Sequence, residues 1–411
     1  MNQSLITALC SVGFLARFSY ALARNPVLPL FAVFLGAGPE AIGLAVGIST
    51  VTGIFFKLPA GALSDIIGRR RTMLAGLCFF AFIPLLYPFI TSYGQLVAVR
   101  FLHGFATAIY GPVAMAVVAD VAGNRKGEML GWFSSVAIIG TLLGAPVGGF
   151  ILSLLSNPDG ASGVLNTTGT AFTVVYAIVA VTGLASLALG ARILLKDEQV
   201  APHDPNQSRL ATFMSGIRQV MGDRRIVATS AMEGVQNMTM GALEAFLPVY
   251  AVTVAGLSPL EAGLLWGVQV VVTMLAKPVM GRVSDSFGRK PLIVAGLVCC
   301  ALPFAAIPYL TGMLPLLAAC LAFGFGEALV TSSSAAMVAD MCKAKHFGTA
   351  MGVFGTIFDV GHASGPIVGG LLVGALGYRS AFAIMGALLI VAIPWFLAVM
   401  RGRTEDTGAE A

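Results

Sequence analysis

Charge is scarce in this sequence. Only 10% of its 411 residues are Asp, Glu, Lys or Arg, whereas 57% are hydrophobic and the mean hydropathy is +0.89. A soluble protein of this size needs charge on about a quarter of its residues to cover its surface. The composition therefore excludes an ordinary soluble protein and predicts a polytopic membrane protein.

The signatures of common enzyme and metal sites are also missing. The sequence has no phosphate-binding glycine loop with a lysine, no metal-binding pair of histidines and no hydrolase elbow. Its six cysteines lack zinc-ligand spacing, so we predict neither disulfides nor a metal. The net charge of +5 resides in short loops without interleaved aromatics, which argues against nucleic acid as a partner. We expect no enzyme activity and no cofactor.

Long apolar runs dominate what is present. Twelve runs are each long enough for a transmembrane helix of about 20 residues, which predicts an all-α membrane protein with 12 transmembrane helices. Lysines and arginines concentrate in the even-to-odd connections, for example at Arg69 to Arg71, and are almost absent from the odd-to-even connections. Basic loops stay in the cytoplasm, so both termini are expected there. We predict a multi-pass protein of a plasma membrane, most simply a bacterial inner membrane.

One polar loop occurs twice, 220 positions apart (281 − 61). The first copy contains Gly61, Asp65, Gly68, Arg69 and Arg70, and the second contains Gly281, Asp285, Gly288, Arg289 and Lys290. The repeat predicts two matching six-helix halves, residues 1–195 and 226–411. A cytoplasmic linker, 196–225, joins them, and its apolar positions fit either an amphipathic surface helix or a plain solvated one.

The loop pattern G-x-x-S-D-x-x-G-R-[RK] resembles the loop between the second and third helices of major facilitator superfamily transporters. The resemblance extends over essentially the whole chain and implies the major facilitator fold, with two pseudo-symmetric halves. It also implies that the loops form a conformational latch between the halves; the alternative is that their bases only set the topology. Lys57 and Lys277, one turn before each loop, are expected to extend to the membrane interface.

Ionisable side chains inside the predicted spans are candidate substrate or coupling groups, because a charge in a bilayer is costly unless it is paired or faces water. The candidates are Arg17, Arg24, Arg100, His103, Glu233, Asn237, Glu327, Asp359 and His362. Arg100 resembles the family's fourth-helix arginine, which is associated with proton coupling. The second half has Cys320 at the matching position, and it has Glu327 where the first half has Thr107.

These candidates allow several interpretations. Buried carboxylates can exchange protons, which makes Glu233, Glu327 and Asp359 candidate coupling groups. The three arginines can read an anionic substrate, or they can pair with the glutamates of the second half. Arg100 can also simply pack through backbone carbonyls, and each histidine can be a packed, hydrogen-bonded one.

Two glycine-rich segments complete the set of motifs. They contain Gly140, Gly144, Pro146, Gly148 and Gly149 in the fifth run, and Gly361, Gly365, Pro366, Gly369 and Gly370 in the eleventh. The family's fifth-helix motif is associated with antiporting exporters, but here Pro146 is displaced by one position. Glycine at every fourth position also lets two helices approach closely, so the alternative is packing alone.

The function predicted from these features is secondary active transport by alternating access. The favoured form is proton-coupled efflux of a small organic compound, drawing on the proton gradient. The alternatives are transport of an organic or inorganic anion in either direction and a membrane sensor that transports nothing. The expected partners are a small-molecule substrate and the lipid bilayer, with the protein acting as a monomer.

Overall fold

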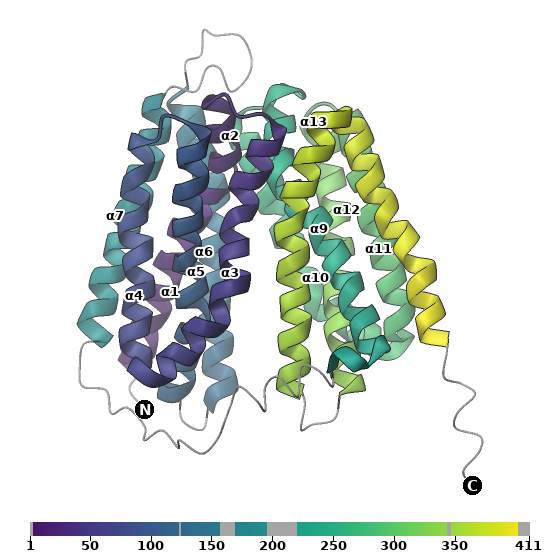
Figure 1. Ribbon diagram of the computed structural model, residues 1–411, viewed down its shortest axis with the longest axis horizontal. Helices are drawn as coiled ribbons and strands as arrows, with labels where there is room; N and C mark the ends of the chain where they lie inside the picture. Colours follow the sequence, from purple (N-terminus) through teal and green to yellow (C-terminus); the bar gives the residue numbers. More distant parts are fainter. Residues whose placement is uncertain (1–2, 123–124, 157–168, 195–219, 343–346, 402–411) are drawn as a thin grey trace. The chain divides into compact units, whose positions relative to one another are not determined.

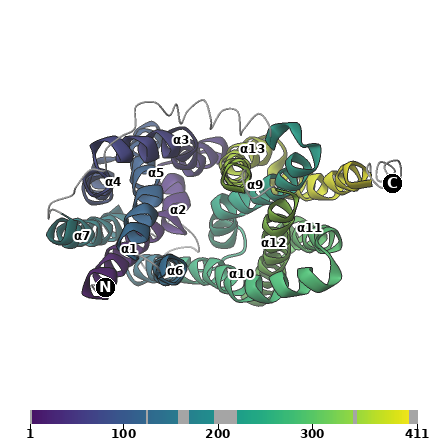
Figure 2. The ribbon, with the colours of Figure 1, turned by 90° about the horizontal axis from the view of Figure 1, so that it is seen from below.

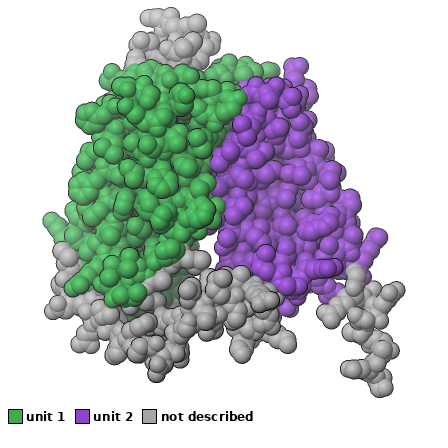
Figure 3. All heavy atoms as spheres, in the orientation of Figure 1, with its two compact units in different colours: residues 1–203, 244–267, 311–313 green, residues 204–243, 268–310, 314–411 purple. Residues whose placement is uncertain are grey.

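The computed structural model describes residues 3–122, 125–156, 169–194, 220–342 and 347–401, and these residues form helices and short turns without strands (Figure 1). Contacts divide the chain into two compact units (Figure 3). Unit 1 comprises residues 1–203, 244–267 and 311–313, and unit 2 comprises residues 204–243, 268–310 and 314–411. Most of the predicted linker, 196–219, lies outside the described residues.

Unit 1 holds the helices of the first half. They are α1 (Gln3–Arg24), α2 (Val27–Phe34), α3 (Pro39–Ile67), α4 (Arg69–Phe82), the 3-10 helix η1 (Ile83–Phe89), α5 (Tyr93–Ala122), α6 (Lys126–Leu154) and α7 (Gly169–Leu194). α1 packs against α6 and α7, and α5 packs against α3 and α4 (Figure 2). The end of α9 and the start of α10 also belong to this unit.

Unit 2 holds most of the second half. Its helices are α9 (Arg224–Thr253), α10 (Pro259–Phe287), α11 (Arg289–Ala306), the 3-10 helix η4 (Ile307–Tyr309), α12 (Met313–Met341) and α13 (Phe347–Arg401). α13 contains a non-helical residue, Gly377, with φ of 74°, so it consists of two helices joined at a kink. Its packing partners include α11.

Ten helices within the described ranges are long and apolar enough to cross a membrane. The prediction of twelve is therefore not confirmed as a count. Two features account for the difference: α13 is counted once although Gly377 interrupts it, and α9 is not among the ten. α9 buries several polar side chains, among them Glu233, Gln236 and Asn237, which lower its hydropathy.

Proline and glycine set the same helix boundaries in both halves. α3 begins at Pro39 and α10 begins at Pro259, where the missing N–H and fixed φ of proline suit the first turn. Each of these helices is followed directly by a glycine of the repeated loop, Gly68 with φ of 101° or Gly288 with φ of 90°. Glycine adopts these left-handed values without the strain that a Cβ causes. The next helix starts one residue later.

The glycine-rich segment of α6 lies against helix backbones within unit 1. Gly140 faces Phe14 and Phe18 of α1, and Gly144 faces Ala21 and Leu22. Further along α6, Gly148 packs near Val27, Gly149 against Pro259, and Pro146 against Gly263 and Gly267 of α10. A side chain at these glycines has no room without a shift of backbone. The segment thus brings α6 next to α1 and to the start of α10.

The matching segment of α13 packs on α9 in unit 2. Gly361 lies against Gly234, and Gly365 lies against Met238 and Ala242. Pro366 and the carbonyl of His362 lie against Gly241, while Gly369 and Gly370 are buried. Small residues on both helices permit this close approach.

Candidate functional site

A cationic and aromatic cluster lies inside unit 1 around Arg100 of α5, which is fully buried. Its guanidinium donates from Nη2 to Ser49 Oγ (2.6 Å), from Nε to the Ala45 carbonyl (3.4 Å) and from Nη1 to the Tyr87 hydroxyl (3.5 Å). It also lies 5.6 Å from the ring centroid of Tyr20. Among the described residues no carboxylate pairs with Arg100. Neutral oxygens and an aromatic face therefore hold this charge.

His103 occupies the next turn of α5 and shares a partner with Arg100. Its Nδ1 is 3.1 Å from the Tyr87 hydroxyl, and its ring meets Tyr20 edge-on at 5.2 Å between centroids. The other nitrogen, Nε2, has no hydrogen bond within the described part of the chain. Arg100 and His103 were predicted to share a helix face, and both contact the hydroxyl of Tyr87.

The two arginines of α1 have different surroundings. Arg24 forms an ion pair with Glu244 of α9, in which its Nη2 donates to Oε2 (2.9 Å), and the Asn25 amide donates to the Glu244 carbonyl (3.2 Å). All three residues belong to unit 1. Arg17 is half-buried beside Gly111, and the described residues provide no ion pair for it.

Unit 2 contains an acidic and amide cluster around Glu327 of α12, which is almost fully buried. Oε2 of this carboxylate accepts from Gln269 Nε2 (2.5 Å) and Thr273 Oγ1 (3.0 Å), both on α10. Its Oε1 lies 3.9 Å from Lys277 Nζ. The Lys277 ammonium thus lies beside a buried carboxylate of opposite charge. The expectation that Lys277 extends to the membrane interface stays a prediction.

Glu233 of α9 is the second buried carboxylate of unit 2. Asn237, one turn later, donates from Nδ2 to Glu233 Oε1 (3.2 Å) and to Gln236 Oε1 (3.1 Å). Oε2 of Glu233 and the hydroxyl of Thr331 on α12 are both buried without a well-formed hydrogen bond among the described residues, and Thr331 lies close enough to interact with Glu233. Gln269 Oε1 is also buried and unpaired among these residues. The cluster therefore contains unpaired donors as well as unpaired acceptors.

The last two candidates lie on α13 and are only half-buried. The His362 ring stacks on Phe358 with 6.3 Å between centroids, and His362 is within electrostatic range of Glu327. Asp359 and His362 both make further interactions. In the described part of the chain, no group of three potential metal ligands gathers.

The repeated loops form corresponding ion pairs inside each unit. Arg69 pairs with Asp120 at the end of α5 (2.6 Å), and Arg289 pairs with Asp340 at the end of α12 (3.1 Å). Arg289 also contacts Asp285 within its own loop (2.5 Å). Nothing is described of the Asp65 side chain, whereas Gly61 and Gly281 lie within helices with open space beside them. Arg70 is half-buried and interacts with other groups.

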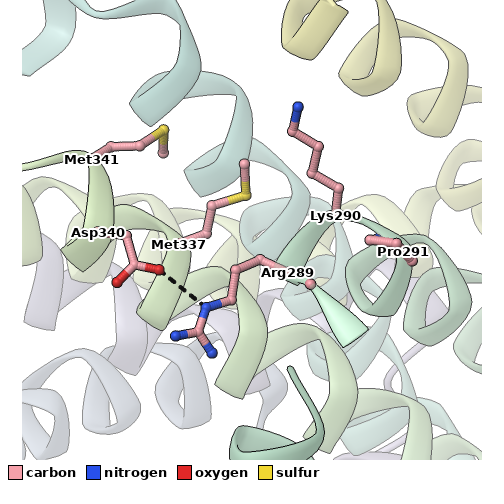
Figure 4. Close-up of a pocket in the computed structure, with 7 residues that line it drawn as sticks. Arg289, Lys290, Pro291, Met337, Asp340 and Met341 are labelled. Atoms are coloured by element: carbon pink, nitrogen blue, oxygen red, sulfur yellow. Dashed lines mark hydrogen bonds and ion pairs between the residues drawn. The ribbon is translucent and has the colours of Figure 1, made fainter. Parts of the chain in front are cut away.

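Sequence reasoning did not identify the aspartates as partners of these arginines. Asp120 and Asp340 stand at matching places in the two halves (340 − 120 = 220), which is the signal that was available. Figure 4 shows the Arg289 guanidinium directed at Asp340 in a pocket of about 400 Å³. This pocket is lined by Gly288, Arg289, Lys290, Pro291, Met337, Asp340 and Met341. None of the buried carboxylates lines it, so it belongs to the loop rather than to the polar cluster of unit 2.

Gln269 and Thr273 were missed for a different reason, because they are uncharged residues in an apolar run. Glu244 was recognised in the sequence as lying on one helix face with Glu233 and Asn237, but its pairing with Arg24 was not predicted. Ser49 and Gln269 stand at matching positions of the repeat (269 − 49 = 220). Ser49 accepts a hydrogen bond from Arg100, and Gln269 donates one to Glu327.

Comparison with known proteins places the chain among transporters. The family model described as Major Facilitator Superfamily matches residues 9–276 and 255–411. An uncharacterized MFS-type transporter of Methanocaldococcus jannaschii is 23% identical over 94% of this chain and 93% of its own length. The homolog of the multi-drug resistance efflux pump PmrA in Lactococcus lactis is 24% identical over 90% and 88%. The synaptic vesicular amine transporter of Mus musculus is 22% identical over 81% of this chain, which spans 61% of that protein.

Solved structures show the same fold at low identity. The nucleoside transporter NupG matches with a TM-score of 0.78 and 15% identity, covering 98% of this chain and 100% of that one. A bacterial homolog of the human lysosomal transporter Spinster, in an inward-facing and unoccupied conformation, matches with a TM-score of 0.79 and 14% identity over 97% and 96%. With a family model that covers nearly the whole chain, this protein belongs to the major facilitator superfamily.

Proposed function

We propose that this transporter exports a small organic compound in exchange for protons, by alternating access. The observation that supports this most strongly is the cluster of unit 2, where Glu233 and Glu327 are both buried. Carboxylates inside a membrane protein are costly and therefore usually functional. A carboxylate can carry a proton and can also bind a positively charged or donor-bearing substrate.

Unpaired acceptors in this cluster support a substrate that brings hydrogen-bond donors. Gln269 Oε1 is a buried acceptor without a partner among the described residues, and Oε2 of Glu233 has the Thr331 hydroxyl nearby without a well-formed hydrogen bond. A buried acceptor left unpaired costs about 1–3 kcal/mol, which a bound amine or similar donor recovers. Relatives named as a multi-drug efflux pump and as an amine transporter are consistent with such substrates.

The alternative, transport of an anion read by arginines, has less support. Arg100 uses its donors on Ser49, Tyr87 and a carbonyl, and Arg24 uses its donors on Glu244. One observation still favours the anion: Arg17 is half-buried, and no ion pair is found for it in the described ranges. Arg17 is therefore the arginine on which this alternative depends.

The setting we propose follows from the orientation of the basic loops. The protein works as a monomer in a plasma membrane, the inner membrane of a bacterium, with both termini in the cytoplasm. The proton gradient is the energy source, without a cofactor. The repeated loops act as the conformational latch, and their ion pairs with Asp120 and Asp340 hold each loop to its own unit.

The test is transport by the full chain in proteoliposomes with an imposed pH gradient. The probes are ethidium as an organic cation and fluorescein as an organic anion. We expect ethidium to accumulate on the acidic side and to leak back when an ionophore collapses the gradient. Glu327→Gln should abolish accumulation, whereas Glu40→Gln, at an exposed position in the first turn of α3, serves as the control. Accumulation of fluorescein that Arg17→Gln removes would support the anion instead.

A further inference from the structure

We propose that Lys277 is the built-in counter-charge of Glu327 and sets the pH range in which this carboxylate releases and takes up its proton. The inference rests on the proposed function in assigning Glu327 a coupling role. It adds a positioning residue, on a different helix, that the family resemblance did not identify.

The two oxygens of Glu327 have separate partners. Gln269 and Thr273 donate hydrogen bonds to Oε2 and fix the orientation of the carboxylate. Oε1 has no such donor among the described residues and faces Lys277 Nζ at 3.9 Å. Neutral donors therefore hold Oε2 by hydrogen bonds, whereas Oε1 interacts with Lys277 through charge alone.

The geometry makes Lys277 a displaceable counter-charge. At 3.9 Å the contact is too long for a hydrogen bond but well within the range of strong electrostatic interaction. The Lys277 side chain is 40% exposed, whereas that of Glu327 is 11% exposed. The lysine side chain is therefore less confined by its neighbours than the carboxylate.

Three other titratable groups lie within electrostatic range of Glu327, namely Glu233 on α9, Cys300 on α11 and His362 on α13. Lys277 lies within electrostatic range of Glu233 as well. One lysine thus interacts with two buried carboxylates, so its removal takes a positive charge away from both.

The repeat supplies a matched control. Lys57 is the first-half counterpart of Lys277 (277 − 57 = 220), and Thr107 stands where the second half has Glu327. Thr107 donates to the carbonyl of Gly104 in its own helix. Lys57 therefore has the same position in the sequence pattern but faces no carboxylate at residue 107.

The first experiment observes the proton on Glu327 directly and needs no substrate. Infrared difference spectra of the full chain in lipid nanodiscs record the carbonyl stretch of protonated carboxylic acids against pH, and Glu327→Gln identifies the Glu327 band. Removing a cation within 4–6 Å should move the midpoint of this band by roughly one to three pH units. We expect Lys277→Gln to move it towards alkaline pH, Lys277→Arg to restore it, and Lys57→Gln to leave it unchanged.

A second measurement does not require any lysine variant to fold. Acetic anhydride modifies lysine amines, so the extent of labelling at Lys277, read by mass spectrometry, reports whether its ammonium is engaged by a partner. Glu327→Gln should increase labelling of Lys277, because the lysine then loses the carboxylate 3.9 Å away, and it should leave labelling of Lys57 unchanged.

The two measurements decide the inference separately from the proposed function. An unchanged midpoint in Lys277→Gln, or equal labelling of Lys277 in wild type and Glu327→Gln, overturns the role of Lys277. Persistent gradient-driven transport by Glu327→Gln overturns the proposed function and leaves the counter-charge as an electrostatic pair without a coupling role. Transport kinetics of Lys277→Gln add a further readout, since we expect its pH optimum to shift while KM for ethidium changes little.

Discussion

The polar clusters of unit 1 and unit 2 differ in chemistry although they occupy matching parts of the repeat. In unit 1 a buried guanidinium, Arg100, is surrounded by tyrosines and a serine. In unit 2 a buried carboxylate, Glu327, is surrounded by an amide, a threonine and a lysine. Among the described residues no carboxylate pairs with Arg100, whereas Glu327 lies beside Lys277.

The backbone packing beneath the two clusters is the same. Gly104 of α5 lies against the Ser49 carbonyl and Thr52, and Gly324 of α12 lies against the Gln269 carbonyl and Thr273. The close approach of two helices is thus the same in both halves. The residues that differ between the halves around this contact decide whether the cluster is cationic or acidic. Sequence symmetry therefore predicts architecture in this chain but not the role of a position.

The largest expected effect comes from moving the carboxylate between the clusters. Glu327→Thr gives the second half the residue of the first, and we expect gradient-driven accumulation of ethidium to disappear because the carrier then only equilibrates its substrate. Adding Thr107→Glu should not restore accumulation, since that position lacks Gln269 and Lys277. Rescue by the double variant would show that the two clusters are interchangeable.

The next effect concerns the buried cation of unit 1. Arg100→Gln removes three hydrogen bonds from a fully buried site, and we expect a loss of about 3 kcal/mol in stability. The matching change in unit 2, Cys320→Ser, should cost about 1 kcal/mol or less, because the thiol carries no charge network. Thermal unfolding in detergent measures both. Equal losses of stability in the two variants would mean that the hydrogen bonds of Arg100 do not stabilise unit 1.

A smaller effect is expected at the ion pair between Arg24 and Glu244. Each single change to glutamine leaves a partly buried charge unpaired, and we expect losses of about 1–3 kcal/mol. Combining Arg24→Gln with Glu244→Gln should recover part of the loss, with a coupling of about 1–2 kcal/mol. Arg24→Gln combined with Glu233→Gln is the control and should be additive. Coupling to Glu233 instead would contradict the pairing seen in unit 1.

The smallest effect should come from the repeated loops. Arg69 and Arg289 pair with aspartates that are more than half exposed, so each arginine should contribute about 0–1 kcal/mol. We expect Arg69→Gln and Arg289→Gln to have similarly small effects, because each arginine pairs with an exposed aspartate at the end of another helix. Thermal unfolding at low and high salt measures both losses. A loss well above about 1 kcal/mol in either variant would contradict a solvent-screened ion pair.

Much of the architecture was predictable because its signals are local. Apolar runs marked the helices, and Gly68 and Gly288 marked the turns between helices. We predicted that arginines of the first half pair with acids of the second half, and Arg24 does so. Its partner is Glu244 rather than Glu233 or Glu327. The proximity of Lys277 to Glu327 was not predicted, because nothing local in the sequence connects the two residues.

The sequence by itself determined that this chain is a repeated, helical membrane protein of the major facilitator superfamily. Hydropathy and turn residues act over a few neighbouring positions, so they can be read along the chain. Only the tertiary structure decided which polar groups meet, as Lys277 meets Glu327 and Arg24 meets Glu244. The physical reason is that helices apolar nearly all round have no strong polar face. Their rotation about their own axes is set by glycine contacts and packing against several neighbours, and this rotation selects the partner of each buried charge.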